Sequence, residues 1–125
     1  MSKKVKWLKR PEDKDWLAAN DYLNLLGYDS LPDIDLNKLP IQSFKAKDIL
    51  RASGLQLLPE NNIKVKSKEK KINDGNPLSP IILVLTEPGK NLVIADGYHR
   101  VCAVFYENQD AEIPCIIRYI KPTEH

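Results

Sequence analysis

Residues 94–105 read IADGYHRVCAVF and pass from the end of an apolar run, through a polar pentapeptide, into an amphipathic pattern. This order predicts a strand that turns directly into a helix. Such a junction brings backbone N–H groups and the positive end of the helix dipole to one point, which favours an anion. Asp96 is expected to cap the helix, while Gly97 permits a sharp turn and a close approach by a ligand. His99 and Arg100 add a titratable ring and a permanent cation, so we expect a small charged ligand at this corner.

The residues on both sides of this corner extend the pattern. The continuous β-branched run at 81–85 predicts a buried strand, and a Glu-Pro-Gly-Lys turn leads back through a second strand at 92–95. The two strands form a hairpin that delivers the chain to the corner. Apolar residues at i, i+3, i+4 and i+7 then predict a helix over 97–107, with Cys102 on its buried face. A last strand is expected over 113–120.

The first half of the chain predicts further helices and short strands. Their expected ranges are an edge strand at 4–7, a helix at 12–26, one helical turn at 35–39, a strand at 41–44, a helix at 46–53 capped by Gly54, and a basic helix from 64 that ends at Gly75. We therefore expect one α+β domain over residues 1–125, in which helices flank a small mixed sheet. Residues 1–10 form a basic segment and residues 121–125 a loose tail.

The composition limits the classes of protein to which this chain can belong. The 125 residues suit one domain, and 42% hydrophobic residues suffice for a core. No run is long enough to cross a membrane, and the basic N-terminus lacks the apolar segment of an export signal. Two cysteines, Cys102 and Cys115, fit a reducing compartment, so a cytoplasmic location is expected. The His and Cys spacing matches no metal site.

Lysines gather in two places, residues 1–10 and residues 64–71. If these segments meet in space they form a positive surface, which makes nucleic acid a candidate partner. The net charge of +2 and the lack of interleaved aromatic residues for base stacking argue against that interpretation. A solvated surface is the favoured alternative.

Two segments together carry a family resemblance. Residues 73–84 read NDGNPLSPIILV, and after the hairpin residues 94–103 read IADGYHRVCA. This pattern resembles the ParB/sulfiredoxin superfamily across roughly residues 65–120. With residues 44–55 included, the most similar members are small bacterial ParB-like proteins. The resemblance implies a compact sheet flanked by helices and a nucleotide, ATP, ADP or CTP, with Mg²⁺ as an accompanying ion.

The resemblance also implies roles for individual residues. The segment that matches Asp96–Arg100 holds nucleotide phosphates at a helix start in that superfamily, and the matching Ser-Pro lies near the nucleotide. The candidate phosphate-binding residues are therefore Ser79, Pro80, Gly97, Tyr98, His99 and Arg100. His99 and Asp96 are the candidate catalytic residues. An imidazole can carry a proton near neutral pH, while Asp96 could orient that ring, hold a metal-bound water or only cap the helix.

Three interpretations stay open at this stage. The first is a nucleotide-dependent phosphotransferase or NTPase. Sulfiredoxin activity is not expected, because Tyr98 replaces the reactive cysteine, and the chain has no residues left for the DNA-binding and dimerisation parts of a partition protein. The second is a non-catalytic regulatory or DNA-binding module. In the third, the motif is only structural, and Arg100 pairs with Glu107 or Asp110.

Overall fold

The computed structural model describes residues 4–31 and 38–120. Within these ranges the helices are α1 (Asp13–Leu25), α2 (Ala46–Ser53), α3 (Ile63–Asn73) and α4 (Tyr98–Glu107). The strands are β1 (Gln42–Lys45), β2 (Ile81–Leu85), β3 (Val93–Asp96) and β4 (Glu112–Tyr119). The predicted α+β class is confirmed.

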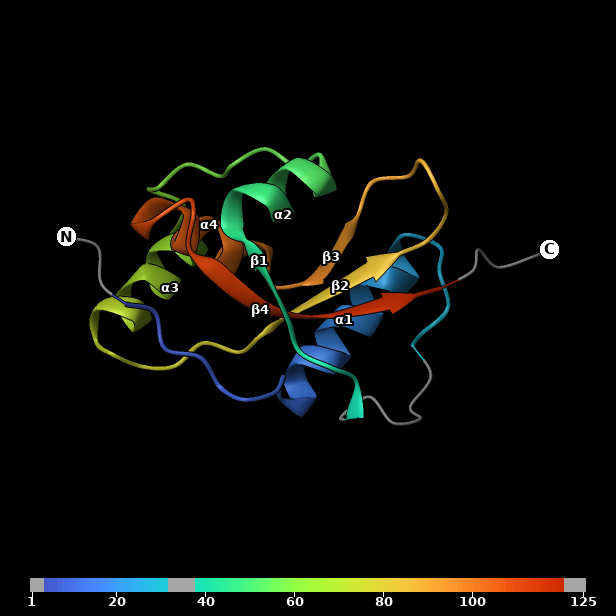
Figure 1. Cartoon of the computed structure of the whole chain (residues 1–125), viewed down its shortest axis with the longest axis horizontal. Helices are drawn as coiled ribbons and strands as arrows, with labels where there is room; N and C mark the ends of the chain where they lie inside the picture. Colours follow the sequence, from blue (N-terminus) through green and yellow to red (C-terminus); the bar gives the residue numbers. More distant parts are fainter. Residues whose placement is uncertain (1–3, 32–37, 121–125) are drawn as a thin grey trace.

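The strands of the described chain form one mixed sheet in the order β1-β4-β2-β3 (Figure 1). The central strands β2 and β4 are parallel, whereas β1 pairs with β4 and β3 pairs with β2 in antiparallel fashion. Strand β2 is buried along nearly its whole length, as its unbroken apolar sequence requires for a strand covered on both faces. The β2–β3 hairpin is as predicted, and it brings the chain to Asp96 at the end of β3.

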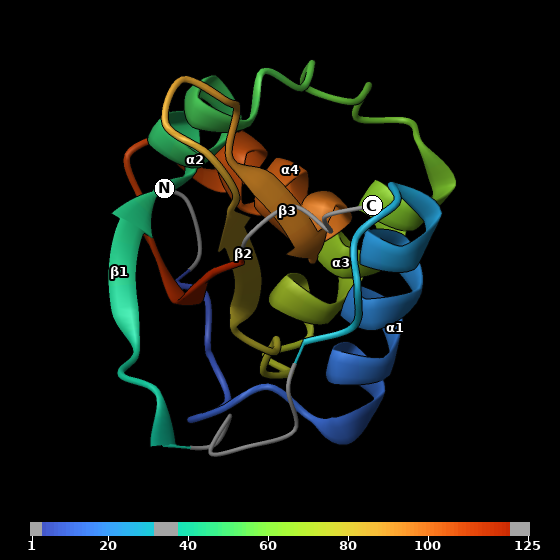
Figure 2. The same cartoon turned by 90° about the vertical axis from the view of Figure 1, so that its right-hand side faces the viewer.

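Helices cover both faces of the sheet. On one face α1 packs against β3 and β2, where Trp16, Ala19 and Leu23 lie in one apolar cluster with residues of β2, β3 and β4. On the other face, α2 and α3 both pack against α4 in the larger cluster, which contains Val101 and Cys102. Figure 2 shows β1 and α1 at opposite sides of the molecule, with β2 and β3 between them. The corner after β3 therefore lies where α1, α3 and α4 come together.

Several expected elements are confirmed almost to the residue. Helix α2 covers the predicted range, and Gly54 ends it in the left-handed conformation at φ 70°. Strand β2 also has its predicted bounds, and the other helices and the last strand differ by one or two residues at their ends. Cys102 is buried as expected, and burial raises the pKa of its thiol and that of Cys115, the latter to about 12. Both sulfurs are therefore protonated thiols within the core.

The edge strand predicted at residues 4–7 is wrong. Trp7 makes only an isolated parallel bridge to Leu78, whose N–H and C=O bond to the backbone of Lys6 and Leu8. The partner segment contains Pro77 and Pro80, which have no N–H to donate, so a longer ladder cannot form there.

Two further expectations fall on residues that the structure does not describe. The helical turn predicted at 35–39 lies mostly outside the described residues, and the tail at 121–125 lies wholly outside them.

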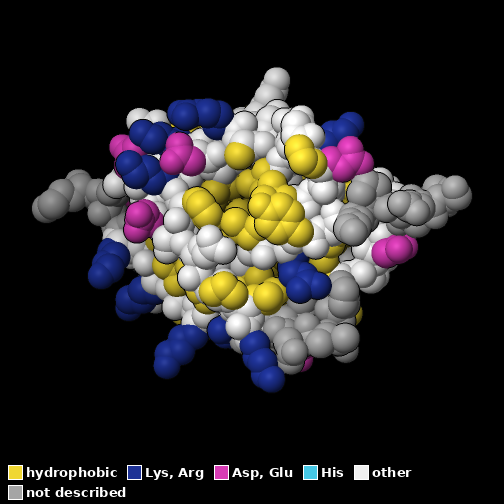
Figure 3. Space-filling model, turned by 45° about the vertical axis from the view of Figure 1, so that its right-hand side comes forward, with side chains coloured by type: hydrophobic (Ala, Val, Ile, Leu, Met, Phe, Trp, Pro, Cys, Tyr) yellow, Lys and Arg dark blue, Asp and Glu magenta, His cyan; other side chains and the backbone are white. Residues whose placement is uncertain are grey.

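On the face seen in Figure 3, hydrophobic side chains gather near the middle, and Lys and Arg side chains surround them. None of the helices in the described part of the chain combines the length and apolar character needed to cross a membrane.

Candidate functional site

The turn between β3 and α4 depends on Gly97. This residue has φ 112°, a backbone conformation that residues with a side chain rarely adopt. A Cβ atom here would lie 2.4 Å from Cδ1 of Ile81. Gly97 is itself the N-cap of α4, and no side chain caps the helix. The prediction that Asp96 caps the helix is therefore wrong, because its carboxylate binds Arg100 instead.

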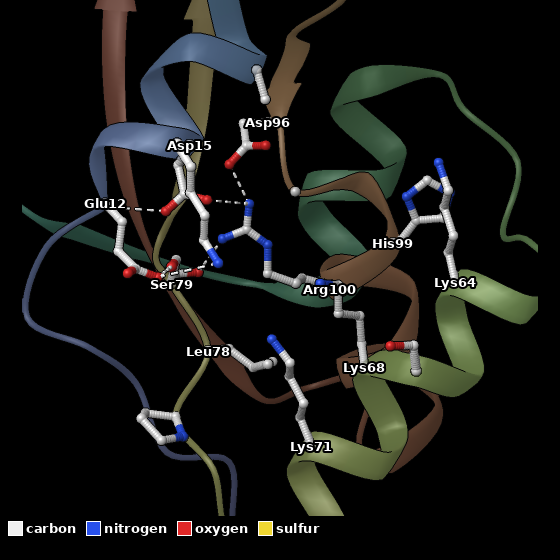
Figure 4. A pocket seen from close by; sticks show the side chains of 15 residues that line it. Glu12, Asp15, Lys64, Lys68, Lys71, Leu78, Ser79, Asp96, His99 and Arg100 are labelled. Carbon is white, nitrogen blue, oxygen red and sulfur yellow. Dashed lines mark hydrogen bonds and ion pairs between the residues drawn. The ribbon is translucent and has the colours of Figure 1, made fainter.

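Arg100 is almost fully buried and joins three parts of the fold (Figure 4). Its Nη1 donates to the carbonyl oxygens of Ser79, at 2.6 Å, and Pro80, at 3.2 Å. Its Nη2 donates to the carboxylate of Asp96 and lies 3.8 Å from Oδ1 of Asp15. The guanidinium thus ties the start of α4 to the segment before β2 and to the first turn of α1.

The alternative partners that the sequence suggested for Arg100 are not the ones observed. Asp110 forms its ion pair with Lys47, at 2.6 Å, and Arg100 forms its own with Asp96 and Asp15. The third interpretation, a helix-capping motif with a surface ion pair, therefore does not describe this corner. Most of the hydrogen-bonding capacity of Arg100 is used within the protein, so we regard it as a positioning residue.

Asp15 brings a second carboxylate that sequence reasoning did not find. It is buried, it accepts a hydrogen bond from the backbone N–H of Glu12 at 2.8 Å, and it faces Asp96 across Arg100. Burial raises the pKa of Asp96, and neighbouring Asp15 raises it further, while Arg100 acts in the opposite direction. In the sequence, the local signal for Asp15 was its place in the acidic first turn of α1, and acidic residues are common at helix starts.

A cavity of about 460 Å³ opens beside this network. Five of the residues predicted for the site line it: Ser79, Asp96, Gly97, His99 and Arg100. Six charged residues that were not among the predicted site residues also line it: Glu12, Lys14, Asp15, Lys64, Lys68 and Lys71. Most of the residues that line the cavity are therefore polar or charged.

Two predicted site residues are not part of the cavity lining. The hydroxyl of Tyr98 donates to the carbonyl oxygen of Gln56, so its ring points toward the loop between α2 and α3. Pro80 contributes only its carbonyl oxygen, which accepts from Arg100. Neither side chain is placed to contact a ligand in the cavity.

The lysines of α3 form the cationic side of the pocket. Figure 4 shows Lys68 and Lys71 extending from α3 toward the cavity, and Lys64 beside His99. Burial lowers the pKa of Lys68, and the nearby charges of Lys71 and Arg100 lower it further. In the sequence these lysines indicated a basic helix, interpreted as a solvated surface or, less favoured, as part of a surface for nucleic acid. The spacing of 64, 68 and 71 was the available signal, because it places them on one side of α3.

His99 is half-buried at the mouth of this cationic side. Burial lowers the pKa of its imidazole, and the charges of Lys64 and Lys68 add to that effect. The ring is therefore neutral at neutral pH, and one of its nitrogens can accept a proton.

The donor set does not fit a metal ion held by the protein. No three His, Cys, Asp or Glu side chains gather in a way that could hold a metal within residues 4–31 and 38–120. Asp15 and Asp96 already bind Arg100. Any Mg²⁺ at this site would have to be held largely by the ligand.

Comparisons of the chain with known protein families, curated proteins and solved structures found no match. The fold class follows from the structure itself. The resemblance to the ParB/sulfiredoxin superfamily stays a prediction from the sequence.

Proposed function

We propose that the pocket beside Gly97 binds a phosphate-bearing ligand, with a nucleotide such as ATP, ADP or CTP as the first candidate. The observation that carries this proposal is the lysine side of the cavity, formed by Lys64, Lys68 and Lys71 facing the start of α4. Lysines attract phosphate as point charges, and burial, together with the nearby charge of Lys71, lowers the pKa of Lys68. A bound anion relieves that repulsion.

The start of α4 supports the same proposal. No side chain caps this helix, so no capping side chain occupies its first N–H groups, and Gly97 at its start lines the cavity. This is the role that the ParB-like resemblance implies for the segment. His99 adds a neutral ring at the same point, and the N–H of this ring can donate to a phosphate oxygen.

Phosphoryl transfer is the second candidate function. Its specific support is Glu12, a pocket residue whose carboxylate is not one of the ion-pair partners of Arg100. It accepts a hydrogen bond from the hydroxyl of Ser79 at 3.3 Å and lies 3.7 Å from the ammonium of Lys14. A carboxylate at this place could accept the proton of an acceptor hydroxyl. Asp96 is less suited to that role, because it is bound to Arg100.

Calorimetric titration tests the proposed binding. We expect ATP, ADP and CTP to bind with dissociation constants of about 1 μM to 1 mM, and adenosine and cytidine to give no heat of binding. The titrations are made with and without Mg²⁺, and released phosphate is measured in the same samples to separate turnover from binding.

Two outcomes contradict the proposal. Nucleosides that bind as tightly as nucleotides would show that phosphate is not what the pocket recognises. A lack of binding by every phosphate compound, together with salt-dependent binding of duplex DNA, would favour the DNA-binding alternative.

A further inference from the structure

The three pocket lysines of α3 form a row rather than a point. Positions 64, 68 and 71 follow the i, i+4, i+7 spacing of one helix face. At 1.5 Å of rise per residue, the row extends for about 10 Å along the helix axis. A single phosphate group is too small to contact all of it, whereas a chain of two or three linked phosphates is not.

The charges of this row are not used inside the protein. In the described ranges no ion pair or hydrogen bond involves the ammonium groups of Lys64, Lys68 or Lys71. Lys70, which lies on another side of the same helix, is bound to Asp74 at 2.9 Å. Within the described part of the chain, the ammonium groups of the three pocket lysines are therefore unpaired, and the side chains of Lys68 and Lys71 are half-buried.

The cavity offers little to a nucleotide base. Among the described residues that line it there is no Phe, Tyr or Trp, and its apolar lining comes from Ala18, Pro77 and Leu78. Base recognition usually relies on aromatic stacking, and among the described lining residues only the half-buried ring of His99 offers an aromatic stacking surface. The charged residues, in contrast, are numerous and converge on one space.

We propose that the row Lys64–Lys68–Lys71 binds a linear chain of two or more phosphates and that the pocket recognises this chain rather than a base. The inference rests on the proposed function, because it specifies which part of a phosphate-bearing ligand is bound and by which residues. The chain can belong to a nucleotide or to inorganic polyphosphate. The chemistry is the same in both, and the two sources are separated by the test.

The test compares inorganic phosphates of increasing length. Wild-type protein is titrated with orthophosphate, pyrophosphate and tripolyphosphate at low ionic strength, and with ATP and CTP under the same conditions. We expect affinity to increase with chain length, by about tenfold or more from orthophosphate to tripolyphosphate. ATP, CTP and tripolyphosphate are expected to bind within a few-fold of one another and to compete.

The matched variants are Lys68→Gln, Lys71→Gln and Lys66→Gln. Lys66 is exposed on the same helix and does not line the cavity, so its replacement removes the same charge from the same element. We expect Lys68→Gln and Lys71→Gln each to weaken tripolyphosphate binding by about tenfold, and Lys66→Gln to change it by less than about twofold. Circular dichroism and thermal unfolding establish that each variant is folded.

The outcomes separate this inference from the proposed function. Binding of neither nucleotides nor tripolyphosphate by the wild-type protein overturns both. Binding of nucleotides without binding of tripolyphosphate leaves the proposed function and overturns the inference, because the base is then required. Equal losses in all three variants also overturn it, since the general charge of α3 would then explain the binding.

Discussion

Replacement of Arg100 by Met is expected to lower the free energy of unfolding by about 3–5 kcal/mol, as loss of one partner from a buried ion pair usually does. The guanidinium is nearly inaccessible to solvent, and it neutralises both Asp15 and Asp96. Without it, two buried carboxylates face each other. The carbonyl oxygens of Ser79 and Pro80 also lose their donor. Denaturant unfolding followed by circular dichroism measures the loss.

The matched control is Arg51→Met. Arg51 is an exposed arginine whose ion pair with Asp48 has a separation of 3.7 Å, so its loss is expected to cost no more than about 0.5 kcal/mol. Equal destabilisation by the two substitutions would contradict the assigned role of Arg100.

The pH dependence of the Arg100→Met variant gives a second check. Burial and Asp15 already raise the pKa of Asp96, and loss of Arg100 removes the influence that lowers it. A carboxyl whose pKa is raised in the folded state stabilises the fold relatively more at low pH, and that advantage disappears as the pH increases through the folded-state pKa. The deficit of the variant is therefore expected to be smaller at about pH 5 than at about pH 7. Because the substitution destabilises the fold, a loss of ligand binding by an Arg100 variant would first reflect that loss of stability.

Gly97→Ala is expected to produce the second large effect, a loss of about 3 kcal/mol from backbone strain and overpacking together. The backbone has φ 112°, and the new Cβ would lie 2.4 Å from Cδ1 of Ile81 and 3.2 Å from Nη2 of Arg100. The methyl group therefore displaces both a core side chain and the buried guanidinium. Thermal and denaturant unfolding measure the change.

Gly27→Ala separates the two causes. Gly27 has φ 94°, but nothing lies within 4 Å of its Cβ position, so only the backbone strain applies. We expect this control to lose about 1–2 kcal/mol. If both glycine variants lose the same stability, close packing at the β3–α4 corner is not the reason for Gly97.

Local sequence patterns predicted most of the secondary structure. The β-branched run of β2 and the glycine that ends α2 are short-range signals, and each element has the predicted bounds. The segment at residues 4–7 alternates as a strand does, yet it forms only one bridge, because the prolines around Leu78 limit its partner. Such a restriction arises from a distant segment and is not contained in the local pattern.

The candidate site was predicted less completely than the fold. The corner at Gly97 and His99 lies in one continuous motif and lines the pocket. Asp15 and the lysines of α3 reach the same cavity only because α1 and α3 converge on the start of α4. The carboxylate of Asp96 binds Arg100 four residues later instead of the first N–H groups of α4, which explains why the expected helix cap is absent.

Two-dimensional amide NMR during titration with tripolyphosphate tests most directly where the ligand binds. Saturable shifts are expected at Gly97 and His99 and along α3 at Ser67, Lys68 and Lys71, with the amides of α2 unchanged. An absence of saturable shifts, or shifts confined to residues remote from this cavity, would contradict the proposal that the pocket binds a phosphate chain.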